Sequence, residues 1–314
     1  MKYRLCVVFC LLLQGVIGQA LAQSNMPREL WGGVRLEPPA RMRGKDLPWD
    51  HEIQVALPPG YAKSDKRYPV LWLTDGHAIF TEGVNVVRRL TTQVPQMIIV
   101  GVGVTPEAVG EFQTRRGYEF SPFDNWKETN APGRDVYMKA GAAMDEYTKK
   151  AGMGAFERAG GARQFLSFIV DDVRPALAKQ YRMSDVNILF GHSGGGTFCT
   201  YALVARPEGF QKYICSSAAL YGGNEHFFEL ESRYARAHDD MKADVFFGAG
   251  EKEIVQPAIA GLGLVSSTVR MVEVLSERKY PSLKLSMRIF PAEDHTTTLP
   301  MSLSFGLRTV WKED

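Results

Sequence analysis

The sequence predicts one α/β domain, built on a doubly wound and mostly parallel sheet with flanking helices. Short, continuously apolar runs of the kind that form buried strands alternate along the chain with segments whose apolar residues recur at helical spacing. Strands that alternate with helices are typical of a parallel sheet that is covered on both faces. We find no internal repeat and no sign of a second domain, so residues 23–314 are expected to fold as a single domain.

The central observation is a strand that runs into a glycine-rich turn and then into a helix. Residues 186–190 are mostly apolar and end at Gly-His-Ser-Gly-Gly-Gly, residues 191–196, after which apolar residues follow at helical spacing. In this context G-x-S-x-G predicts a nucleophile elbow, which exposes Ser193 on a turn too tight for larger neighbours. The alternative is a glycine-rich turn with an incidental serine. His192 is expected to point away from the nucleophile and to pack.

Hydrophobic periodicity places the other elements in chain order. Residues 23–50 lack a sustained period and are expected to wrap the surface or to pair at a sheet edge. Residues 115–123 are expected to form a loop, and residues 124–159 a lid or pocket wall. Strands are predicted at residues 51–57, 68–74, 93–104, 186–190, 213–217, 244–247 and 283–290, and helices at 162–181, 197–205, 227–237, 258–275 and 301–311.

The first 22 residues are predicted to be a signal peptide. Lys2 and Arg4 form a basic start, residues 5–17 form an apolar core, and Ala20-Leu21-Ala22 is an A-x-A cleavage site. The apolar core is too short to span a bilayer comfortably. We therefore expect an exported protein, periplasmic or secreted, without a membrane span.

Composition narrows the classes of function. Without Lys2 and Arg4, 37 basic residues become 35, which equals the 35 acidic residues. A net charge near zero offers nothing to nucleic acid or to an anionic membrane surface. No metal-binding, P-loop or dinucleotide-binding pattern is present, so neither a metal nor a cofactor is expected. Cys199 and Cys215 remain after processing; two separately buried thiols are expected, with a disulfide as the alternative.

A serine nucleophile needs a general base, which His295 is predicted to supply. A serine hydroxyl is a poor nucleophile near neutral pH, and it needs both a base and a group that orients this base. In a sheet of this topology both partners follow the serine in the chain and lie beyond strand ends. His226 and His238 lie in or beside polar helical stretches, whereas His295 directly follows a predicted strand.

Two glutamates compete for the orienting position. Glu251 and Glu253 both follow the strand predicted at residues 244–247, and the topology is neutral between them. Asp294 is a weaker rival, because adjacent side chains on an extended segment point apart.

Backbone N–H groups are expected to form the oxyanion hole. One should belong to Gly194, directly after the nucleophile, and the other to His77, in the loop that follows the early buried strand. Four side chains are candidates for substrate contact, each with ordinary packing or solvation as its alternative: Arg116, Tyr118, Trp126 and Tyr221.

With these residues placed, the chain resembles the putative esterase family of α/β-hydrolases, which contains esterase-D-like and enterochelin-esterase-like serine esterases. The resemblance extends from Glu52 to Trp311. It implies the α/β-hydrolase fold and a triad of Ser193, Glu253 and His295. Glu253 is preferred to Glu251 only on this ground, because the acid of the family takes the fourth position of Gly-x-x-Glu. The matching stretches are Tyr68-Pro69-Val70 before Asp75-Gly76, Arg116 before Ser121-Pro122, Gly160-Gly161 with Phe165, Gly191-His192-Ser193-Gly194-Gly195, Ser216-Ser217, Gly250-x-x-Glu253 and Glu293-Asp294-His295.

The expected function is that of an exported serine carboxylesterase, which cleaves an ester or thioester of a small molecule through an acyl-enzyme. Members of the family cleave feruloyl, siderophore and acyl-thioester bonds, so the resemblance leaves the substrate open. An acyltransferase is the near alternative, because an alcohol can replace water as acceptor. A non-catalytic binding protein would be expected to carry a damaged serine, acid or base, and all three are intact here.

Overall fold

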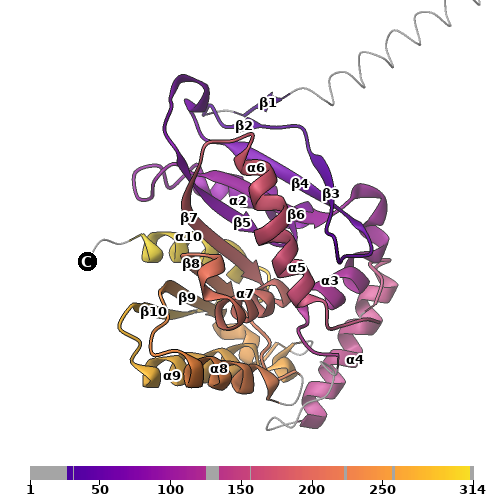
Figure 1. The fold of residues 1–314 in the computed structure, drawn as a ribbon. Helices are drawn as coiled ribbons and strands as arrows, with labels where there is room; N and C mark the ends of the chain where they lie inside the picture. Colours follow the sequence, from indigo (N-terminus) through magenta and orange to yellow (C-terminus); the bar gives the residue numbers. More distant parts are fainter. Residues whose placement is uncertain are drawn as a thin grey trace, which may run out of the picture.

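A ten-stranded sheet organises the part of the chain that the structure describes. The computed structural model describes residues 27–30, 32–124, 134–155, 157–222, 225–256 and 259–311, so the predicted signal peptide and Trp126 lie outside the described residues. The strand order is β1-β2-β4-β6-β5-β7-β8-β9-β10, with β3 paired to β4 (Figure 1). The strands are β1 (Arg28–Glu29), β2 (Arg35–Leu36), β3 (Ala40–Arg43), β4 (Asp50–Leu57), β5 (Tyr68–Leu73), β6 (Ile98–Val104), β7 (Met183–His192), β8 (Lys212–Ser216), β9 (Ala243–Gly250) and β10 (Leu283–Phe290).

The sheet is parallel from β6 to β10 and antiparallel at the edge that the N-terminal segment forms. Strands β6, β5, β7, β8, β9 and β10 pair in parallel, each with its neighbour. The pairings of β1, β2 and β3, and that of β4 with β6, are antiparallel. This topology confirms the predicted doubly wound, mostly parallel sheet, and it places the segment after residue 23 at a sheet edge, one of its two predicted positions.

Helices cover both faces of the sheet. Side chains alternate along β5, so Val70 and Trp72 join the core on one face, whereas Leu71 and Leu73 join the core on the other. Helices α5 and α6 cross the first face, and α2 and α10 cover the second (Figure 1). The helices are α2 (Gly76–Val87), α3 (Phe112–Phe120), α4 (Arg134–Lys150), α5 (Ala162–Ser167), α6 (Arg174–Ala178), α7 (Gly194–Ala205), α8 (His226–Ala237), α9 (Leu264–Arg278) and α10 (Thr298–Val310). None of those in the described ranges is long and apolar enough to cross a membrane.

Helices α2 and α3 differ from the sequence prediction. The loop expected at residues 115–123 is largely helix α3, whose polar and glycine-bearing sequence carries little helical signal of its own. Tertiary packing supplies what intrinsic propensity lacks, because Gly117 and Phe120 of this helix are buried. Helix α2 was not predicted at all, although its buried residues recur at helical spacing: Ile79, Phe80, Gly83, Val84 and Val87.

Cys199 and Cys215 form a disulfide, so the expectation of two separate thiols is wrong. Cys199 lies on α7 and Cys215 on β8, and both are fully buried. The sequence places these residues on different elements but does not show that α7 packs directly on β8. That packing brings the two Cα atoms to 5.4 Å, within the range that a disulfide requires.

Candidate active site

Ser193 lies on a sharp turn between β7 and α7, at the end of the sheet to which the parallel strands point. Its backbone has φ 59° and ψ −120°, a conformation that residues with side chains rarely adopt. The turn is too tight for a side chain at Gly191, where a Cβ would lie 2.0 Å from the carbonyl oxygen of Gly195. The N–H of Ser193 donates to the carbonyl of Ser216 on the neighbouring strand, at 2.9 Å. These contacts hold the serine in the strained geometry of a nucleophile elbow.

His295 and Glu253 meet beside this turn. His295 follows β10, and Glu253 lies in a short 3-10 helix, Glu251–Ile254, that follows β9. Nδ1 of His295 lies 2.6 Å from Oε1 of Glu253, whose side chain is fully buried. The second carboxylate oxygen, Oε2, accepts the N–H of Gly250 at 2.9 Å. Because a carboxylate only accepts, Nδ1 donates to it and leaves Nε2 as the acceptor on the ring.

The competing acids are engaged elsewhere. The carboxylate of Glu251 is exposed and accepts the N–H of Ala292 at 2.7 Å. Asp294 accepts the N–H groups of Thr296 and Thr297, at 2.9 and 3.0 Å, just before α10. The geometry therefore favours Glu253 for the orienting position, and the catalytic roles of the three residues remain predictions.

A cavity of about 590 Å³ opens onto Ser193 and His295. The wall is mainly apolar. Part of it comes from α4 and the turn after it, so the described part of residues 124–159 forms a pocket wall. The apolar lining includes Ile79, Phe112, Phe120, Phe123, Met144, Met153, Phe227, Ile259, Leu262, Leu264 and Leu299. Within the described ranges, no group of three or more His, Cys, Asp or Glu residues is arranged to hold a metal ion.

Comparison with known proteins identifies the family. The family model described as "Putative esterase" matches residues 44–135 and 136–257. The chain belongs to the putative esterase family. Ferri-bacillibactin esterase BesA from Bacillus subtilis is 26% identical over 254 residues, 77% of this chain and 78% of BesA. A siderophore enterobactin esterase from Emericella nidulans is 25% identical over 293 residues, 84% of this chain and 89% of that protein.

The fold of this esterase is also found in solved structures. The crystal structure of the BES protein from Bacillus cereus matches with a TM-score of 0.68 and 25% identity, over 90% of this chain and 97% of that chain. The esterase has the α/β-hydrolase fold, with its mostly parallel sheet and flanking helices. It is an enzyme of the esterase class.

His192 of the esterase packs, as expected, but its ring lies beside the predicted base. The centroids of the His192 and His295 rings are 4.6 Å apart. Nδ1 of His192 lies 3.0 Å from Oγ of Ser216, which in turn bonds Oγ of Ser302 at 2.9 Å. The ring also bonds the backbone of His295. Burial, followed by the positive charges of His295 and Arg116, holds the pKa of His192 well below its usual range.

This lowered pKa predicts a loss of stability in acid. Below the ordinary imidazole value of 6.5, the unfolded chain binds a proton that the buried His192 ring rejects. The free energy of unfolding should therefore fall with decreasing pH, by about 1.4 kcal/mol per pH unit for each such proton. His192→Asn removes this proton and should make the fall shallower by up to that amount. Urea unfolding between pH 7 and 5 measures the slope, and His238→Asn, at an exposed position, is the control. Equal slopes in His192→Asn and the wild type would contradict the assignment.

The predicted oxyanion donors both begin helices. Gly194 is the first residue of α7 and His77 the second of α2, and the first N–H groups of a helix have no partner within it. Gly194 lines the cavity. Asp75 and Ala78 also line it, whereas His77 does not, and its ring packs against Phe112 at 4.5 Å. The N–H of His77 stays a prediction as the second donor.

The four side chains predicted to contact substrate occupy different positions relative to the cavity. Arg116 lines the cavity, but Tyr118 and Tyr221 do not, and Trp126 lies outside the described residues. Residues two apart on a helix face different directions, so the ring of Tyr118 turns away and packs against Trp49, at 5.6 Å between centroids. Tyr221 packs against Phe228 at 6.4 Å. The contact of these two tyrosines with substrate therefore stays a prediction, which the lining of the cavity does not support.

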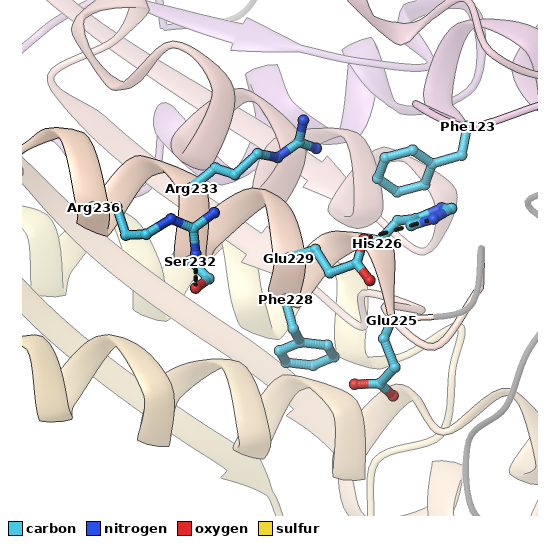
Figure 2. Close-up of a pocket in the computed structure, with 8 residues that line it drawn as sticks. All are labelled: Phe123, Glu225, His226, Phe228, Glu229, Ser232, Arg233 and Arg236. Atoms are coloured by element: carbon cyan, nitrogen blue, oxygen red, sulfur yellow. Dashed lines mark hydrogen bonds and ion pairs between the residues drawn. The ribbon is translucent and has the colours of Figure 1, made fainter.

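A second hollow, of about 770 Å³, lies along α8 and was not predicted. Phe123 lines both this hollow and the cavity at Ser193. Figure 2 shows the ring of Phe123 beside His226, and the side chains of Arg233 and Arg236 further along the helix. The centroids of the Phe123 and His226 rings are 4.9 Å apart. His226 therefore lies in a different hollow from Ser193. This position agrees with the sequence prediction, which chose His295 and not His226 as the general base.

Proposed function

We propose that the esterase is an exported serine hydrolase that cleaves a carboxylic ester through an acyl-enzyme. The observation that carries the proposal is the hydrogen bond between Nδ1 of His295 and the buried carboxylate of Glu253, on the same cavity as Ser193 and its strained elbow. A histidine that is held by a carboxylate and that lines the same cavity as a serine is the arrangement that nucleophilic catalysis requires.

This arrangement supports the following sequence of proton transfers. Nε2 of His295 takes the proton of Ser193 as Oγ attacks the ester carbonyl, and the imidazolium that forms is stabilised by the carboxylate of Glu253. Negative charge on the carbonyl oxygen is met by the N–H of Gly194, at the positive end of α7. His295 then protonates the leaving alcohol, which departs and leaves the acyl group on Ser193. Water, deprotonated by His295, releases the acid in the second half of the cycle.

The cavity and the relatives together suggest the class of substrate. An apolar wall favours an ester whose acyl or alcohol part is hydrophobic or aromatic. The names of two relatives state that they are esterases of ferri-bacillibactin and of the siderophore enterobactin. Siderophore esters are therefore the first substrates to test on this chain, with simple aromatic esters as the comparison.

Export is supported by two independent features. Residues 1–22 have the pattern of a signal peptide, and Cys199 and Cys215 are joined in a disulfide. Structural disulfides persist mainly in oxidising compartments such as the periplasm and the extracellular space. Intact mass of the protein recovered outside the cytoplasm should correspond to a chain that begins at Gln23. A full-length chain confined to the cytoplasm would contradict export.

The acyl-enzyme can be trapped directly. The mature protein is incubated with p-nitrophenyl esters and a siderophore triester, and separately with a fluorophosphonate, before intact-mass analysis. We expect hydrolysis and a single adduct on the wild type, and neither on Ser193→Ala. Hydrolysis or an adduct that persists in Ser193→Ala would overturn the proposal, and so would a folded wild type that does neither.

The α4 wall should set acyl preference. Met144→Ala enlarges the cavity, and we expect kcat/KM for a longer acyl chain to rise relative to acetate, by about tenfold, because one methylene in an apolar pocket has effects of this order. A p-nitrophenyl ester series from two to twelve carbons, roughly the reach of such a pocket, measures it. Lys149→Ala, at an exposed position on the same helix, is the control. An unchanged profile in Met144→Ala would show that this wall does not contact the acyl chain.

A further inference from the structure

Arg116, on α3, is engaged with two loops at once. Its Nε donates to both carboxylate oxygens of Asp75, at 3.1 Å each. Its Nη2 lies 3.1 Å from Oδ2 of Asp75 and donates to the carbonyl oxygen of His192, also at 3.1 Å. Both charged side chains are nearly excluded from solvent, with 12% of Arg116 and 9% of Asp75 exposed. Charge-assisted contacts in such surroundings are strong and directional.

The two acceptors belong to the loops that supply the predicted oxyanion donors. Asp75 precedes α2 and lies two residues before His77, in a left-handed backbone conformation with φ 55°. The carbonyl of His192 directly precedes Ser193. Strands β5 and β7, from which these loops arise, are neighbours in the sheet. One guanidinium thus joins the loop after β5 to the nucleophile elbow.

The elbow is also shaped around this guanidinium. A Cβ at Gly194 would lie 2.8 Å from Nη1 of Arg116 and 3.1 Å from its Cζ. Glycine at this position therefore leaves the space that the guanidinium fills. Cζ of Arg116 lies 5.6 Å from the ring centroid of Phe112 and 5.3 Å from that of Phe120. These cation–π contacts keep the guanidinium beside α3.

We propose that Arg116 is a positioning residue, which fixes the distance between the elbow and the loop after β5 and so keeps the oxyanion hole assembled. The proposal rests on the proposed function. Its Nε and Nη2 are directed to Asp75 and to the carbonyl of His192, so we assign to Arg116 an action through these loops instead of the role of a counter-charge for an anionic substrate. Preorganised donors contribute mainly to the transition state, so the loss of Arg116 should lower kcat more than it raises KM.

The experiment compares Arg116→Ala with Arg206→Ala, whose side chain makes an exposed guanidinium–carboxylate contact with Asp171. With a p-nitrophenyl ester, we expect kcat of Arg116→Ala to fall by about 10²–10³, the loss typical of one oxyanion donor, with KM changed by less than about threefold. Guanidinium ion, at concentrations far below those that unfold proteins, should restore part of kcat, and ammonium at the same concentration should not. Arg206→Ala should match the wild type.

Three results would overturn the proposal: kcat of Arg116→Ala within twofold of the wild type, a loss confined to KM, or no restoration by guanidinium in a folded variant. If Arg116→Ala does not fold by circular dichroism, Arg116→Lys takes its place, because lysine keeps the charge but lacks the fork that reaches both acceptors. We expect Arg116→Lys to lower kcat as well, and a kcat equal to that of the wild type would contradict the proposal. Wild-type turnover that depends on Ser193 is measured in the same assay, so failure of the proposed function is seen there, independently of Arg116.

Discussion

Replacing Ser193 or His295 with alanine is expected to lower kcat for ester hydrolysis by about 10⁶-fold, the loss found when one member of a serine–histidine pair is removed. Ser193→Ala removes the atom that forms the covalent bond. His295→Ala leaves the hydroxyl without an acceptor for its proton, because Nε2 of this ring is the nitrogen that the Glu253 contact leaves free. The two losses should not add, since the residues act as a unit, and the double variant should resemble either single one.

Comparing kcat among histidine variants shows whether His295 or another imidazole acts as the base. His192 lies close to His295, but its Nδ1 is engaged with Ser216. His238 stacks on Tyr234, with centroids 4.1 Å apart, and does not line the cavity. His238→Ala is therefore the matched control and should keep full activity. Near-normal turnover in His295→Ala would show that another group acts as base, and the assignment of the triad would fail.

The features that the sequence predicts well are those that local chemistry determines. The elbow needs a buried strand, two glycines and a helix, all contiguous in the chain, so Ser193 could be placed without knowledge of distant contacts. His295 could be placed because one strand ends directly before it. The parallel sheet follows from strands that are apolar throughout, which is the pattern of burial on both faces.

What the sequence does not predict depends on tertiary packing. Glu251 and Glu253 both follow β9, and only the turn of the 3-10 helix brings one carboxylate to the ring of His295 while the other faces Ala292. The Cys199–Cys215 disulfide requires the packing of α7 on β8. Reading residues 115–123 as a loop made Tyr118 a candidate equal to Arg116, and the helix that the structure shows turns the two side chains apart.

Glu253→Gln should lower kcat by about 10³–10⁴, whereas Glu251→Gln should change it by less than about threefold. The amide that Glu253→Gln introduces can donate to Nδ1 of His295, which then carries its proton on Nε2 and cannot accept the proton of Ser193. The substitution also removes the charge that stabilises the imidazolium. The carboxylate of Glu251 accepts the N–H of Ala292 in an exposed contact, and glutamine can accept the same bond. The two variants thus form a pair matched in chemistry and separated by two positions.

The pattern of the two losses distinguishes three arrangements of the site. A large loss in Glu253→Gln alone establishes Glu253 as the orienting acid. A large loss in Glu251→Gln alone would mean that the acid lies two residues earlier and that the loop after β9 rearranges during turnover. If neither substitution matters while His295→Ala remains inactive, His295 works without a carboxylate partner and the site is a serine–histidine dyad. Because Oε2 of Glu253 also accepts the N–H of Gly250, urea unfolding of Glu253→Gln is measured beside kcat. A loss of kcat in a variant of wild-type stability assigns the effect to the orientation of His295 rather than to the loop that carries it.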